Sequence, residues 1–168
     1  MAILPLPKRE FHTRRTLYGT HTKGATLIKD LKGQEKLCID KYKKHAACAT
    51  DPQLKKLFEQ IASVEEGHLN TLTQMEQGQA PGVSGGQSST ITTFAAYHSQ
   101  ADTPEKQQDC YLCTDLLTTE KHASGLYNTC VFEFGQSELR KVLNHIQTEE
   151  QNHGEMIYKY MQENHMYA

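Results

Sequence analysis

The sequence contains no tryptophan and no long apolar run, and neither sign of charge dominates among its 168 residues. Lys and Arg number 18 against 20 Asp and Glu, a net charge of −2. A membrane-spanning helix needs about 18 to 20 consecutive apolar residues, and a secretory signal needs an apolar stretch near the N-terminus. Neither occurs, so we expect a soluble protein kept inside a cell. Without a clustered basic excess, nucleic acid is not an expected partner.

The five cysteines are odd in number and irregularly spaced, unlike the framework of a secreted disulfide-rich protein. We therefore interpret them as reduced thiols. Cys110 and Cys113 form a single C-x-x-C pair in the first turns of a predicted helix, with no matching second pair. A redox or zinc role for this pair and an ordinary structural role both remain open.

Charge is unevenly distributed along the chain. Residues 1–24 carry five basic residues and one acidic residue, so this arm has a net charge of +4, whereas the rest of the chain has a net charge of −6. Such an arm either binds an acidic partner or a second copy of the chain, or remains a solvated tail.

Alternation typical of strands is nearly absent, and apolar residues recur at spacings of three and four, which predicts a mostly helical fold. We expect helices at about 25–49, from 52 to near Gly78, from 103 to Gly135, and from Ser137 to near the C-terminus. Asp51-Pro52 and Thr103-Pro104 are typical helix starts, with a capping side chain followed by proline. Residues 78–102 are rich in small and turn-forming residues and predict a long connection.

The chain contains an internal repeat with an offset of 85 residues. The pairs that match without a gap are Asp30/Asp115, Leu31/Leu116, Glu35/Glu120, Lys36/Lys121, Tyr42/Tyr127, Leu54/Leu139, Lys56/Lys141, Ile61/Ile146, Glu65/Glu150 and His68/His153. We infer two antiparallel hairpins, 25–77 and 103–168, joined by a crossover at 78–102. This connectivity predicts an all-α, ferritin-like four-helix bundle as one domain over residues 25–168.

Each predicted helix has ionisable residues on its apolar stripe. Glu35 and Glu120 take positions where leucine would be expected, and each of the other two helices carries a Glu-x-x-His pair. Unpaired carboxylates in a small core would cost several kcal/mol each. Glutamate and histidine three residues apart can bind the same ion, and one Glu from each of two helices with Glu-x-x-His from the other two is the di-iron or di-manganese pattern. The predicted ligands are Glu35, Glu65, His68, Glu120, Glu150 and His153.

Two features support a dinuclear site. Glu35 and Glu65 lie about equally far from the first turn, as do Glu120 and Glu150 from the second, so all six groups can meet at one level. Four carboxylates with two neutral imidazoles balance two divalent cations. The oxygen-rich ligand set favours Fe or Mn over zinc. The alternative is a coincidence of polar residues on helix surfaces.

Other residues near this stripe have less specific roles. Tyr42 and Tyr127 follow Glu35 and Glu120 by two turns, so they either bond a ligand carboxylate or donate an electron to an oxidised metal pair, or are core aromatics with a satisfied hydroxyl. His45, His122 and Glu133 are possible extra ligands, but we interpret them as residues on helix surfaces or at the edge of the core. We expect Glu66 and Glu149 to face solvent.

The residues from Asp115 to Lys121, Tyr127, Ser137-Glu-Leu-Arg, Glu150-Gln-Asn-His153 and the closing Tyr-Met-x-x-x-x-Met-Tyr resemble the spore coat protein F family, itself ferritin-like. The resemblance is strongest over 105–168 and recurs in 25–76. It implies a protein made in the mother-cell cytoplasm during sporulation and placed in the spore coat, with other coat proteins as partners. The wider ferritin-like group implies O2 or H2O2 chemistry, with Glu35 and Glu120 as terminal ligands, Glu65 and Glu150 as bridging ligands, and His68 and His153 as nitrogen ligands.

Two hypotheses follow. In the first, the chain is a coat protein that binds two Fe or Mn ions and has oxidase, peroxidase or catalase-like activity. In the second, it is a purely structural coat component whose metal site is vestigial or only stabilises the core. Since paired ferritin-like hairpins often dimerise, we also expect a homo-oligomer, most simply a dimer.

Overall fold

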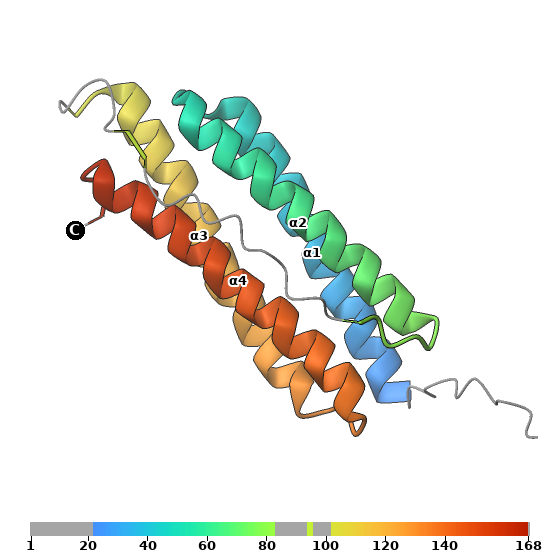
Figure 1. The fold of residues 1–168 in the computed structure, drawn as a ribbon. Coiled ribbons are helices and arrows are strands. Elements are labelled where there is room, and N and C mark those ends of the chain that lie inside the picture. Colours follow the sequence, from blue (N-terminus) through green and yellow to red (C-terminus); the bar gives the residue numbers. More distant parts are fainter. Residues whose placement is uncertain (1–21, 83–93, 96–101, 168) are drawn as a thin grey trace, which may run out of the picture.

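The computed structural model describes residues 22–82, 94–95 and 102–167. These residues form four long helices, α1 (Thr22–Cys48), α2 (Pro52–Glu76), α3 (Pro104–Val131) and α4 (Ser137–Glu163), and no strand occurs among them. Helix α1 packs along α2 and α3 packs along α4, as Figure 1 shows, so the molecule is a bundle of two helical hairpins. The prediction of an all-α four-helix bundle built from paired hairpins is confirmed. The predicted basic arm lies outside the described residues as far as residue 21.

The helix starts follow from local capping chemistry. Asp51 has an extended backbone and its side chain accepts a hydrogen bond from the Gln53 amide, while Pro52 occupies the first helical position of α2. Thr103 caps α3 in the same way through the Lys106 amide, ahead of Pro104. These starts occur where the sequence predicts them.

Two helix boundaries differ from the expected ones. Helix α1 begins at Thr22, earlier than the expected Ala25, and α3 ends at Val131, before the expected stop at Gly135. The chain leaves the helix ahead of Phe134, whose side chain is buried in the core. Helix α2 ends as predicted, since Gly78 adopts a left-handed φ of 76° just after it.

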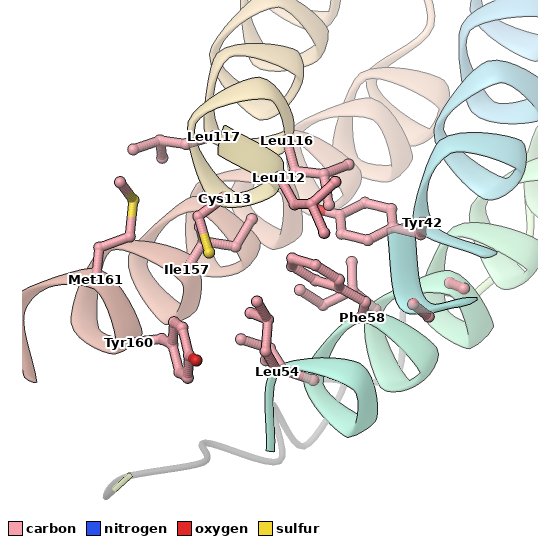
Figure 2. Packing of buried hydrophobic residues seen from close by; sticks show 14 of the residues in the cluster. Tyr42, Leu54, Phe58, Leu112, Cys113, Leu116, Leu117, Ile157, Tyr160 and Met161 are labelled. Atoms are coloured by element: carbon pink, nitrogen blue, oxygen red, sulfur yellow. The ribbon is translucent and has the colours of Figure 1, made fainter. Parts of the chain in front are cut away.

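The apolar interior consists of two clusters, one toward each end of the bundle. The first contains Tyr42, Phe58, Leu112, Leu116 and Tyr160 among others, and Figure 2 shows Tyr42 and Phe58 from the first hairpin next to Leu112 and Leu116 from the second. The second cluster includes Ile28, Leu72, Tyr127, Leu143 and Ile146. Between these clusters in sequence order on every helix lie the ionisable stripe residues, so the packing of both clusters fixes their height.

A buried polar contact links the two hairpins at the α1–α2 turn. The Asp109 carboxylate on α3 accepts hydrogen bonds from the backbone amides of Thr50 and Asp51, at 2.8 and 2.9 Å. The Tyr160 hydroxyl on α4 donates to Asp51 Oδ2 at 2.7 Å. Because Asp51, Asp109 and Tyr160 are buried, breaking the contact would leave unsatisfied polar atoms in the core. The turn of the first hairpin is thereby fixed against both helices of the second.

None of the helices has an apolar stretch long enough to cross a membrane within the described part of the chain. All five cysteines, each of which lies in that part, are free thiols.

Candidate metal centre

The six predicted ligands all point into the bundle. Each is at most 3% exposed, and together they come from all four helices: Glu35, Glu65, His68, Glu120, Glu150 and His153. Glutamate and histidine three residues apart share one face of α2, and the same spacing recurs on α4. The apolar neighbours on these stripes, such as Ile61 and Ile146, are buried as well. The same periodicity that buries the apolar residues therefore buries the ionisable ones.

The six side chains gather in two overlapping groups. The first group is Glu35, Glu65, His68 and Glu150; the second is Glu65, Glu120, Glu150 and His153; within each, one potential ligand atom per residue lies within 4.8 Å of the others. Glu65 and Glu150 belong to both groups. This is the arrangement that two cations with two bridging carboxylates require.

The two histidines are placed reciprocally. Nδ1 of His68 lies 2.9 Å from a Glu150 oxygen, and Nδ1 of His153 lies 2.9 Å from a Glu65 oxygen. Their rings stack with centroids 5.8 Å apart and an angle of 24° between planes. Each imidazole thus directs Nδ1 toward the shared carboxylate of the other hairpin.

Several buried polar atoms at this centre have no hydrogen bond of acceptable geometry. They are Glu35 Oε2, Glu65 Oε1, Glu120 Oε2, both Glu150 oxygens and His153 Nδ1. Outside the centre, His45 Nδ1 alone among the described residues shares this condition. Buried oxygen and nitrogen atoms that make no hydrogen bond are suitable cation ligands. Such polar atoms are otherwise rare in protein cores. The residues present therefore fit a pair of divalent metal ions.

The proton equilibria of the metal-free groups reflect the crowding. Burial raises the pKa of Glu35 to about 7 and, with the charge of Glu65, raises that of Glu150 well above its usual range. Burial would also raise the pKa of Glu65, but contacts with His153 and His68 outweigh it and hold that pKa low. Burial opposes protonation of His153, yet Glu120 and Glu65 raise its pKa to about 10. Protons on imidazole and carboxyl groups are thus the species that metal ions would displace.

Tyr42 and Tyr127 hydrogen-bond carboxylates of the centre. The Tyr42 hydroxyl on α1 donates to Glu120 on α3, and the Tyr127 hydroxyl on α3 donates to Glu35 on α1. Burial and the charges of neighbouring glutamates raise the pKa of both phenols, which keeps them protonated donors. Each tyrosine therefore holds one oxygen of the carboxylate that belongs to the other hairpin, the hydrogen-bonding role predicted for it. Both hydroxyls are also satisfied in the core.

Glu149 is the residue near the centre that the sequence pattern did not identify. We expected it to face solvent with Glu66; Glu66 is exposed and pairs with Lys43, but the expectation is wrong for Glu149. Its carboxylate accepts a hydrogen bond of 2.8 Å from Nε2 of His68 and lies 3.4 Å from His145. A carboxylate behind a ligating imidazole fixes its tautomer and orientation. The residue that the repeat offset pairs with Glu149 is Val64. An acidic residue that has no acidic counterpart in the other hairpin was therefore the signal in the sequence that could have identified Glu149.

The remaining candidate residues lie away from the two groups. His45 contacts Asp115 at 2.8 Å, His122 is exposed, and Glu133 pairs with Lys23 at the surface. Cys113 is buried, and burial raises the pKa of its thiol well above the usual range, which disfavours the reactive thiolate. The Cys110 thiol donates to the Met166 carbonyl oxygen. His45, His122 and Glu133 thus lie on helix surfaces or at the edge of the core, in agreement with the interpretation from the sequence.

Comparison with protein families supports the resemblance found in the sequence. Residues 108–168 match the family model of the Coat F domain. The matched segment contains nearly all of α3, the α3–α4 turn and α4. The match supports a spore coat protein and includes Glu120, Glu150 and His153. No curated protein and no solved structure gives a significant match.

Proposed function

We propose that this Coat F domain protein is a spore coat component that holds a dinuclear Fe or Mn centre of ferritin-like type and consumes H2O2 or O2 there. The observation that carries the proposal is the pair of four-residue groups that share Glu65 and Glu150, in which several buried carboxylate oxygens and His153 Nδ1 make no hydrogen bond of acceptable geometry. Other coat proteins and a second copy of the chain are the partners we infer.

Charge compensation supports this function over an accidental cluster. Four carboxylates at most 2% exposed come together in the core, and in that medium each uncompensated charge is costly. Two divalent cations would neutralise four carboxylates with both imidazoles neutral. A bound pair of iron or manganese ions supplies two-electron redox capacity and Lewis acidity toward a small oxidant.

The protein residues have distinct roles in this proposal. Glu35 with His68 would hold one ion, Glu120 with His153 would hold the other, and Glu65 and Glu150 belong to both groups and would be shared between them. Tyr42 and Tyr127 orient the terminal carboxylates, and Glu149 orients His68 through Nε2. Apolar clusters on both sides limit water at the centre. The chain thus supplies a fixed set of buried ligands between two apolar clusters.

A purely structural role is the competing proposal. Because ligands from both hairpins share Glu65 and Glu150, bound metal would also cross-link the hairpins and stabilise the bundle without any turnover. The same ligand set is therefore compatible with a metal that only stabilises the coat component.

Metal analysis and peroxide decay separate these roles. We expect about two Fe or Mn ions per chain after native purification or reconstitution, with peroxide consumption that depends on the bound metal. Fewer than about 0.2 ions per chain in both preparations would reject the metal centre. Two ions without turnover of H2O2 or O2 would reject the enzyme and leave the structural role. Glu66→Gln is the matched control, because this exposed residue neighbours Glu65.

A further inference from the structure

A cleft opens on the surface between α2 and α4. It has a volume of about 280 Å³, and its lining includes Gly67, His68, Thr71, His145 and Glu149. Of the six candidate ligands, His68 alone belongs to this lining. The cleft therefore meets the ligand set at one imidazole.

Two side chains of α4, one helical turn apart, connect that imidazole with solvent. Oε2 of Glu149 lies 2.8 Å from Nε2 of His68 and 3.4 Å from Nε2 of His145. The exposed fraction of the side chain rises outward, from 4% for His68 to 21% for Glu149 and 28% for His145. On its inner side, the His68 ring places Nδ1 2.9 Å from Glu150. Oxygen and nitrogen atoms thus follow one another from the surface to the buried ligands.

The chemistry of the cleft suits a divalent cation. Among the described residues that line it, Glu149 is the only acid, and none is lysine or arginine. His145 and Glu149 are four residues apart and share a helix face, and imidazole and carboxylate are ligands of Fe and Mn. The hydroxyl groups of Ser63 and Thr71 can hydrogen-bond the waters of a hydrated ion, each of which needs about 30 Å³.

The histidine–glutamate pair is present in one hairpin only. The repeat offset of 85 places Gln60 at the position of His145 and Val64 at the position of Glu149. An amide and an apolar side chain make a poor cation site. The pair is therefore a specific feature of the second copy of the repeat, on the side of the centre at which His68 reaches the cleft.

Small residues keep this side open. A Cβ atom built on Gly67 would have no other atom within 4 Å, which places this glycine beside open space. At the equivalent positions the second hairpin has Asn152 for Gly67 and Met156 for Thr71. The shorter side chains thus occur where the cleft is found.

We propose that the α2–α4 cleft is the entry site for the metal, where His145 and Glu149 bind a hydrated divalent cation before it reaches the centre past His68. This role rests on the proposed function, because it requires that the centre takes up metal. Oε2 of Glu149 is the atom that His68 contacts in the metal-free protein. Glu149 therefore exchanges this contact for the entering ion and regains it once the ion has moved inward.

The test is the rate at which Mn2+ enters the metal-free protein. The EPR signal of free Mn2+ is lost on binding, so freeze-quenched samples give the loading rate, and metal analysis gives the final content. His145→Gln, which copies Gln60 of the first hairpin, should slow loading about tenfold without lowering the final content. Gly67→Leu, which puts a branched side chain into the open space of the cleft, should also slow loading and keep the final content.

Matched controls lie on α3, outside the cleft. His122→Gln changes an exposed histidine, and Gly125→Leu changes an exposed glycine whose added Cβ would also meet open space. Both variants should load Mn2+ at the rate of the wild type.

The outcomes separate this proposal from the proposed function. Equal loading rates in wild type, His145→Gln and Gly67→Leu, with full metal content in each, would overturn the entry site and leave the proposed function intact. A lower final content in His145→Gln would also overturn it, because His145 would then contribute to affinity and not to entry. A wild type that takes up neither Mn2+ nor Fe2+ would overturn the proposed function and the entry role together.

Discussion

The two hairpins present the same ligands in different surroundings. Each contributes two glutamates and a histidine, and each histidine contacts the shared glutamate of the other hairpin. Behind the ligands the copies diverge: Glu149 in the second hairpin has Val64 as its counterpart, and Ser124 and Gly154 have Ile39 and Leu69. The turns diverge as well, with a side-chain cap at Asp51 and no such hydrogen bond at Gln136.

This comparison distinguishes the residues that are the same in both hairpins, which are the candidate ligands, from the surrounding residues that differ between them. The six candidate ligands are the same residue types in the two copies, whereas the residues that contact them from behind and the chemistry of the turns differ. The bundle therefore has a pseudosymmetric centre whose two hairpins differ in the contact behind one histidine and in their turns.

The largest expected effect comes from removing shared ligands. Glu65→Gln and Glu150→Gln should each lower metal content from about two ions per chain to fewer than about 0.5, because both positions need these carboxylates. His68→Ala and His153→Ala should each remove one ion. Metal analysis of the purified variants checks this, and unequal losses between the two glutamate variants would contradict equal roles for the hairpins.

The next effect tests the unequal turns. Asp51→Ala removes the cap of α2 and the acceptor of the buried Tyr160 hydroxyl, so we expect a loss of about 2 to 3 kcal/mol in the free energy of unfolding. Gln136→Ala, at the turn without a side-chain cap, should change it by less than about 0.5 kcal/mol. Urea unfolding of both variants gives the comparison, and similar losses would show that the turns contribute equally.

Glu149→Gln tests the unequal support of the histidines. Loss of the acceptor charge behind His68 should weaken metal binding at its site by about 10- to 100-fold while the site at His153 keeps its affinity. Chelator competition that resolves two binding steps measures this. A uniform change at both steps would mean that Glu149 acts through overall charge; Glu155→Gln, an exposed acid elsewhere on α4, is the control.

The pH dependence follows from the protons that metal ions displace. His153, with a pKa of about 10, is protonated across the neutral range, and the pKa values of His68 and Glu150 are also raised well above their usual range, so these protons must leave when metal binds. Glu35, with a pKa of about 7, adds a further proton only below that pH. Metal affinity should therefore rise with pH, by at least about tenfold per unit, and more steeply below pH 7 than above it. Calorimetry in buffers of different ionisation enthalpy counts the released protons, and a pH-independent affinity would contradict the proton displacement.

The smallest effect tests the reciprocal tyrosines. Tyr42→Phe and Tyr127→Phe each delete one hydrogen bond to a terminal carboxylate, so both should reduce metal affinity by a few-fold and by similar factors. Competition titrations of the two variants provide the measurement. A large loss in one variant alone would show that the two sides of the centre differ in their terminal ligands.

Much of this fold was predictable from local chemistry. Asp51-Pro52 and Thr103-Pro104 set helix starts through backbone hydrogen bonds within a few residues, and the apolar periodicity determined which side of each helix is buried. The exact match of Glu65 with Glu150 and of His68 with His153 placed the ligands at one height, because helix rise converts residue number directly into distance.

Sequence by itself thus determined the helices, their pairing and the six inward ionisable residues. Only the tertiary structure decided that Glu149 contacts His68, that Asp109 binds the α1–α2 turn, and that Gly154 lies against Leu117 and Glu120. These three features depend on contacts between different helices, where rotation and separation are set by the packing of the whole core and not by spacing along one helix.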